Sequence, residues 1–86
     1  MRVKLVRNNK TVMEVRIEKS DPVLALVGMK YKNMQIFHDQ IKKYESKKMD
    51  VGAGSLRALF FQRQINICNN LIKIYTGEGT VIHTHD

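Results

Sequence analysis

The chain has 86 residues, with 15 lysines and arginines against 8 aspartates and glutamates, and a formal net charge of +7. This length predicts one domain, residues 1–86, whose single core needs no disulfides. One cysteine excludes an internal disulfide, the longest apolar run (23–27) is too short to span a membrane, and the N-terminus lacks the apolar region of a signal peptide. We therefore expect a cytoplasmic protein with a buried, reduced Cys68 and no membrane partner.

The first 17 residues predict a β-hairpin. Basic and apolar side chains alternate over residues 2–7, a second alternation covers residues 11–17, and Asn8-Asn9-Lys10 between them favours a turn. The expected inner face consists of Val3, Leu5, Met13, Val15 and Ile17. Because a lone hairpin is marginal in water, helices must cover this face.

The next segment predicts an amphipathic helix over residues 21–48. Ser20-Asp21-Pro22 is typical of a helix start, with a capping side chain before a proline at the first helical position. The apolar face, spaced by three, four and seven residues, consists of Val23, Leu26, Val27, Met34, Phe37, Ile41 and Tyr44. Gly28 weakens the middle of this helix, which is therefore open to a break near residues 28–33.

Residues 55–76 carry the strongest helical pattern in the chain. At about 100° per residue, apolar side chains gather on one half of the circumference and amides and cations on the other. Two residues break this division, since Leu59 falls on the polar half and Gln64 on the apolar half. Ser55 is placed to cap the first amides, and Gly77 to end the helix in the left-handed conformation.

A rival interpretation of the same stretch is extended. Residues 62–85 would then form a β-meander with a turn at Asn69-Asn70. The helix is favoured because it explains about twenty residues and both ends with one hypothesis. Residues 80–85 predict a last strand, so the expected fold class is α+β, with a small antiparallel sheet and two helices on one of its faces.

The excess positive charge favours a polyanionic partner, and two candidate surfaces for nucleic acid follow from the predicted elements. The first would contact phosphates through cations of the hairpin and the first helix: Arg2, Lys4, Arg7, Lys10, Arg16, Lys42, Lys43, Lys47 and Lys48. The second is the polar side of the later helix, whose amides can pair with bases: Gln62, Arg63, Asn66, Asn69, Asn70 and Lys73. The alternative for both is an ordinary solvated face.

The apolar side of the later helix predicts association. Its seam steps by four, three, four and three residues through Phe61, Ile65, Cys68, Ile72 and Tyr75. This spacing is typical of two helices packed side by side. It predicts a homodimer or a groove for another protein, and the alternative is packing against the helix of the same chain at 21–48.

Other motifs offer little chemistry. Gly52-Ala53-Gly54-Ser55 precedes a helix, as phosphate-binding loops do, but lacks their third glycine and their Lys-Ser/Thr pair. The candidate metal ligands are His83, His85 and Asp86, with His38 or Asp39. A chain end makes a poor rigid ligand set, and no carboxylate pair, histidine–nucleophile arrangement or cofactor motif occurs. We therefore expect no enzyme activity, no cofactor and no bound metal.

Two functional hypotheses remain from the sequence. The leading one is a small non-enzymatic regulatory protein, of the size and charge common in phages and mobile elements, that engages nucleic acid through its basic surface. The alternative is a modulator or inhibitor that binds an acidic partner protein.

Overall fold

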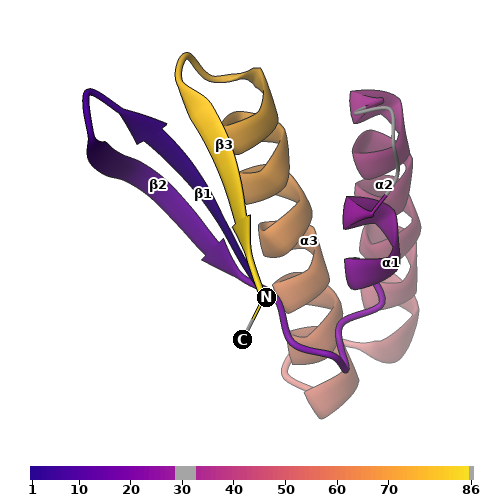
Figure 1. Cartoon of the computed structure of the whole chain (residues 1–86). Helices are drawn as coiled ribbons and strands as arrows, with labels where there is room; N and C mark the ends of the chain where they lie inside the picture. Colours follow the sequence, from indigo (N-terminus) through magenta and orange to yellow (C-terminus); the bar gives the residue numbers. More distant parts are fainter. Residues whose placement is uncertain (29–32, 86) are drawn as a thin grey trace.

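The computed structural model describes residues 1–28 and 33–85. In chain order the elements are β1 (Arg2–Arg7), β2 (Lys10–Arg16), α1 (Leu24–Val27), α2 (Met34–Val51), α3 (Leu56–Thr76) and β3 (Thr80–Thr84). The predicted α+β architecture is confirmed. Figure 1 shows one difference in layering, because α3 lies between the sheet and α2 instead of beside α2 on the sheet. Three strands about 4.8 Å apart form a face little wider than one helix with its side chains, so α3 along this face leaves little of it for α2.

The sheet has the strand order β2-β1-β3, and both outer strands run antiparallel to β1. Asn8 and Asn9 connect β1 to β2 with φ of 53° and 62°. A two-residue hairpin turn of this kind needs positive φ at both positions, which asparagine tolerates. The predicted inner face is confirmed, because Val3, Leu5, Val15 and Ile17 are buried in the core and Met13 packs against it.

The helix predicted over 55–76 is confirmed, and the rival meander over 62–85 is wrong. Ser55 caps α3, since its Oγ accepts a hydrogen bond of 3.0 Å from the Ala58 amide. The buried residues of α3 are Ala58, Gln64, Ile65, Ile67, Cys68, Leu71 and Ile74. Burial between two layers outweighs the modest helix propensity of its isoleucines and asparagines.

Gly77 does not adopt the predicted left-handed conformation. Its φ of −79° and ψ of 158° are those of extended backbone. A Cβ at this position would lie 2.6 Å from Leu5 Cδ2 and 3.0 Å from the Lys73 carbonyl oxygen. The glycine is therefore needed for the close approach of the α3–β3 connection to β1, and not for its backbone freedom.

The helix predicted over 21–48 is divided into α1 and α2, at the position where a break was expected. Residues 29–32 of the predicted break at 28–33 lie outside the described residues. Asn33 starts α2 as its N-cap, and its Oδ1 accepts a hydrogen bond of 3.0 Å from the Gln35 amide. The predicted apolar face of both helices is confirmed, because its residues are buried in the core or pack against it.

The capping role predicted for Ser20-Asp21 is wrong. The N-cap of α1 is Val23, which makes no side-chain cap bond. Asp21 is only 2% exposed, and its carboxylate is directed toward α3 instead. Arg63 on α3 offers this carboxylate two parallel hydrogen bonds between oppositely charged groups, a geometry that a helix N-terminus does not provide.

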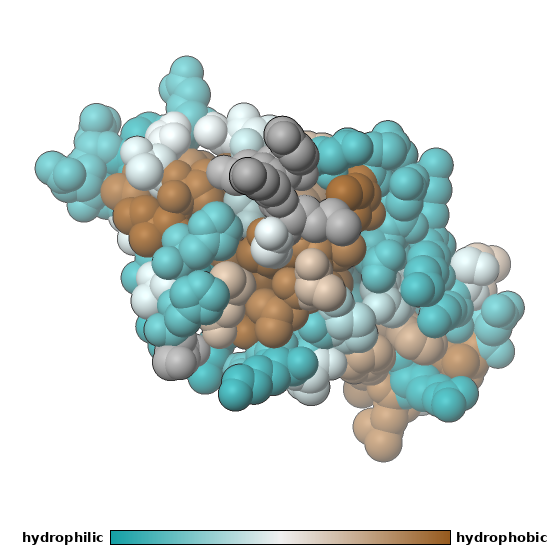
Figure 2. Space-filling model, turned by 45° about the vertical axis from the view of Figure 1, so that its right-hand side comes forward, coloured by the Kyte–Doolittle hydropathy of each residue, from teal (hydrophilic) through white to brown (hydrophobic). Residues whose placement is uncertain are grey.

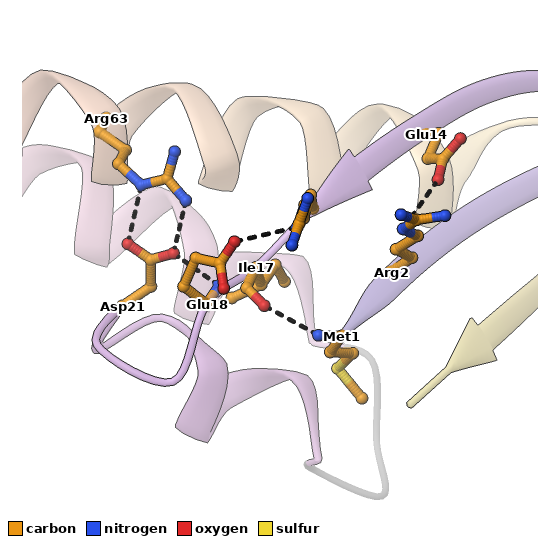
Figure 3. Close-up of polar contacts among 8 residues, drawn as sticks. Met1, Arg2, Glu14, Ile17, Glu18, Asp21 and Arg63 are labelled. Atoms are coloured by element: carbon orange, nitrogen blue, oxygen red, sulfur yellow. Dashed lines mark hydrogen bonds and ion pairs between the residues drawn. The ribbon is translucent and has the colours of Figure 1, made fainter. Parts of the chain in front are cut away.

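Asp21 is the centre of a polar network that joins the β2–α1 connection to α3 (Figure 3). Arg63 donates two hydrogen bonds to it, from Nε at 3.0 Å and from Nη2 at 2.8 Å. Gln64 Nε2 donates a third at 2.7 Å, and the Glu18 amide a fourth at 2.8 Å. Gln64 Oε1 is buried without a hydrogen-bond partner among the described residues.

Candidate nucleic-acid interface

The predicted phosphate-binding cations divide into two groups. Those of the β-hairpin are Arg2, Lys4, Arg7, Lys10 and Arg16, and those of α2 are Lys42, Lys43, Lys47 and Lys48. Because α3 separates the sheet from α2, the two groups lie on opposite sides of the α3 layer (Figure 1). The structure therefore does not join them into one continuous surface.

The sheet face turned away from α3, here called the outer sheet face, brings three cations together. Arg2 on β1 stands directly opposite Arg16 on β2, and Lys4 follows two residues along β1. Like charges directly opposite each other destabilise a sheet. An anion bound between these cations would relieve that repulsion.

Two exposed carboxylates partly balance this cluster (Figure 3). Glu14 Oε1 lies 3.8 Å from Arg2 Nε, and Glu18 Oε1 lies 2.9 Å from Arg16 Nε. All four side chains are at least 40% exposed, so water and salt weaken both pairs. The guanidiniums are therefore available to a phosphate that competes for them.

The remaining predicted cations are more scattered. Arg7 and Lys10 are opposite each other in the strand register, next to the hairpin turn. Arg7 Nε donates a hydrogen bond of 3.1 Å to the Glu78 carbonyl oxygen. Arg63 is held by Asp21. Lys73 is exposed in the last turn of α3, where the helix dipole stabilises a positive charge.

The amide side of α3 meets the edge of β2 in a hollow of about 450 Å³. Its walls are Glu14, Val15, Arg16, Arg63, Asn66, Ile67 and Asn70. The structure thus places one cation of the outer sheet face beside part of the predicted amide stripe. Gln62 bonds within the chain, donating to Asn66 Oδ1 at 2.8 Å and accepting from Lys48 Nζ.

The predicted association seam faces α2 of the same chain. Ile65 and Cys68 are buried, and Phe61, Ile72 and Tyr75 pack against the core. Two ring contacts join the helices, Phe37 with Tyr75 and Tyr44 with Phe61, at centroid distances of 5.9 Å and 5.8 Å. A homodimer through this seam stays a prediction, and it would require α2 to leave the face.

The glycine-rich loop and His83 have ordinary structural contacts. Ser55 Oγ donates a hydrogen bond of 3.2 Å to the Gly52 carbonyl oxygen, while capping α3. His83 Nε2 lies 2.8 Å from Tyr75 Oη. Within residues 1–28 and 33–85, no three histidine, cysteine, aspartate or glutamate side chains are grouped to hold a metal ion, and Asp86 lies outside the described residues.

Cys68 is fully buried, as predicted. Burial raises the pKa of its thiol to about 11, so that the thiolate is not formed at neutral pH. Because the thiolate is the nucleophile, this cysteine is chemically inert in the folded protein.

Sequence reasoning missed an apolar cluster where α2 meets α3. This helical tip consists of Met49, Leu56, Leu59 and Phe60, which are 85%, 85%, 62% and 38% exposed. Figure 2 shows hydrophobic side chains at the lower end of the molecule, where α3 begins in Figure 1. Leu59 on the polar half of the predicted helix was the signal that could have revealed this cluster.

Comparison of the chain with known protein families, with curated proteins and with solved structures finds no match. None of the described helices combines the length and apolar character needed to cross a bilayer.

Proposed function

We propose that the protein is a non-enzymatic, cytoplasmic nucleic-acid-binding protein that contacts the phosphate backbone with its outer sheet face. The observation that supports this proposal best is the direct opposition of Arg2 and Arg16, with Lys4 beside them. A protein that only needed positive charge for solubility would gain nothing by placing two arginines opposite each other.

The chemistry of this face favours affinity over sequence preference. Side chains opposite each other on a sheet have Cβ atoms about 5 Å apart, so two guanidiniums can share one phosphate or contact successive phosphates. Neighbouring positions on β3 carry Thr84, opposite Arg2, and Ile82, opposite Lys4. The threonine hydroxyl can add a hydrogen bond to phosphate or sugar, and no aromatic residue of this face offers a stacking platform.

Fluorescence anisotropy with labelled single-stranded DNA, double-stranded DNA and RNA tests the proposal. Binding should be tightest at about 50 mM salt and weaken steeply at about 200 mM. The double variant Arg2→Ala/Arg16→Ala should weaken binding. It should also reduce the slope of log K against log salt concentration, by about 1.8 for duplex DNA or about 1.4 for a single strand, because two phosphate contacts are lost.

The matched control is Lys42→Ala/Lys43→Ala, which removes the same charge from exposed positions on the other side of α3. It should retain nearly all of the affinity. The proposal fails if no nucleic acid binds at about 50 mM salt. It also fails if both double variants lose the same affinity, because net charge alone would then explain the binding.

A further inference from the structure

We propose that the helical tip docks an acidic amphipathic helix of a partner protein. This inference goes beyond nucleic-acid binding and uses a different part of the molecule. The tip has no structural task of its own, because α3 and α2 bury their apolar faces elsewhere, between the layers. Large apolar side chains exposed at one end of a molecule mark interaction sites more often than scattered ones do.

The tip is built from two short pieces of helix surface. Leu56, Leu59 and Phe60 lie on the first two turns of α3, at spacings of three and four residues. Met49 lies in the last turn of α2. Met49, Leu56 and Leu59 are mostly exposed, and Phe60 is partly exposed with its ring against Phe61.

Two hollows at the tip can receive apolar side chains, one lined in part by Leu56 and Phe60 and the other by Met49. One, of about 600 Å³, is lined by Lys47, Asp50, Val51, Leu56, Arg57, Phe60 and Phe61. The other, of about 500 Å³, is lined by Glu45, Lys48, Met49, Ala53, Gln62 and Ile65. Concave apolar sites with a few charged groups at their rims are typical of the grooves that hold amphipathic helices.

The charges around the tip select an acidic partner. The ionisable residues of the two hollows are Lys47, Lys48 and Arg57 against Glu45 and Asp50. The balance is positive, and the whole chain adds a long-range field of +7. Acidic residues that flank the apolar side of a docked helix would pair with these cations, and the field would speed its approach.

Two other occupants fit less well. The cations of the tip would attract an anionic membrane as well as an acidic helix, but a flat bilayer would leave the two hollows unfilled. A second copy would bring one positive tip against another. Four exposed side chains are also far fewer than the roughly 20–30 residues per partner of a stable protein interface, whereas a helix docks through a few anchor side chains.

The test uses a designed peptide as its probe. The probe is a fluorescein-labelled helical peptide of about 18 residues, with leucines on one face and glutamates on the other. In the reference peptide each glutamate is replaced by lysine. We expect the acidic peptide to bind at least about tenfold more tightly than the basic one. The double variant Leu56→Gln/Leu59→Gln should weaken binding by about tenfold or more, since it removes two anchors.

The control variant Val12→Thr/Ile82→Thr removes two exposed apolar residues from the outer sheet face instead. It should change the affinity by less than about twofold. Glutamine keeps helix propensity and threonine keeps strand propensity, so both variants should fold. An unlabelled oligonucleotide should not displace the peptide, which distinguishes the tip from the basic sheet.

Four results would overturn the inference. The first is equal binding of the acidic peptide to the wild type and to the tip variant. The second is displacement of the peptide by the oligonucleotide, which would place it on the sheet. The third is that the wild type binds no peptide but binds phosphatidylcholine vesicles containing about a quarter phosphatidylserine, and that the tip variant loses this vesicle binding. The fourth is concentration-dependent doubling of mass that the tip variant loses, which would assign the tip to a second copy.

Discussion

Replacing Arg63 with methionine should destabilise the protein by about 2 kcal/mol at neutral pH. Arg63 supplies two of the hydrogen bonds of Asp21, and this carboxylate is almost completely buried. Methionine keeps much of the aliphatic stem of arginine and its helix propensity, so the substitution removes mainly the guanidinium.

The magnitude follows from the exposure of the two partners. Removing one partner of a fully buried ion pair costs about 3–5 kcal/mol. The Arg63 side chain is 47% exposed, so solvent already weakens this pair. Asp21 also keeps its hydrogen bonds from Gln64 and from the Glu18 amide. A loss of about 2 kcal/mol corresponds to a fall in Tm of roughly 10 °C for a chain of this length.

The loss should depend on pH, because the interaction needs an ionised Asp21. Burial acts to raise the pKa of Asp21, but hydrogen bonds from Arg63, Gln64 and Glu18 outweigh burial and hold it below its ordinary value. Such a group stabilises the folded state fully above its unfolded pKa of about 3.9, and the contribution is lost as the pH falls through the folded pKa. The difference between wild type and variant should therefore be largest above about pH 4 and shrink in more acidic solution.

Urea unfolding followed by circular dichroism at about pH 7, 4 and 2.5 measures this difference. Arg57→Met is the matched control, since Arg57 is an exposed arginine of the same helix without an ion pair among the described residues. Its free energy of unfolding should change by less than about 0.5 kcal/mol. Equal losses in the two variants, or a loss for Arg63→Met that persists undiminished in acid, would refute the reasoning.

Three further outcomes are expected from single positions. Gly77→Ala should lower the free energy of unfolding by about 1–3 kcal/mol, because its Cβ would meet Leu5 Cδ2 at 2.6 Å. The control is Gly28→Ala, whose Cβ would meet nothing within 4 Å and which should be nearly neutral. Urea titration compares the two variants. Ser55→Ala should cost about 1 kcal/mol by removing the cap of α3, with Ser55→Thr retaining most of it in the same assay. Cys68, whose buried thiol has a pKa of about 11, should resist Ellman's reagent at about pH 8 and react once urea unfolds the chain; rapid reaction of the native protein would contradict the burial.

Elements whose pattern lies within one segment could be predicted from the sequence. The turn at Asn8-Asn9 and the alternation on either side of it depend on neighbouring residues, as does the two-sided pattern of α3. The exceptions to the α3 pattern were also informative. Gln64, the polar residue on the apolar half, is buried beside Asp21, and Leu59, the apolar residue on the polar half, is exposed at the helical tip.

Asp21 shows why the remaining features could not be predicted. Beside Pro22 its carboxylate has the local pattern of a helix cap, but its partner Arg63 stands 42 residues later in the chain. No period in the sequence reports which distant cation will approach a carboxylate. The separation of the sheet cations from the α2 lysines has the same origin, because it depends on α3 packing between the two elements.

The different lengths of α3 and the strands explain why the molecule offers two unlike surfaces. The 21 residues of α3 span roughly 32 Å, whereas the six residues of β1 span roughly 20 Å. Gly77 and Gly79 hold the end of α3 close to β1, so the excess length extends from its beginning. The overhanging turns carry the helical tip, beyond the cover of the sheet (Figure 1). The two proposed binding surfaces, the charged sheet face and the apolar tip, share no residue, so occupation of one should leave the other accessible.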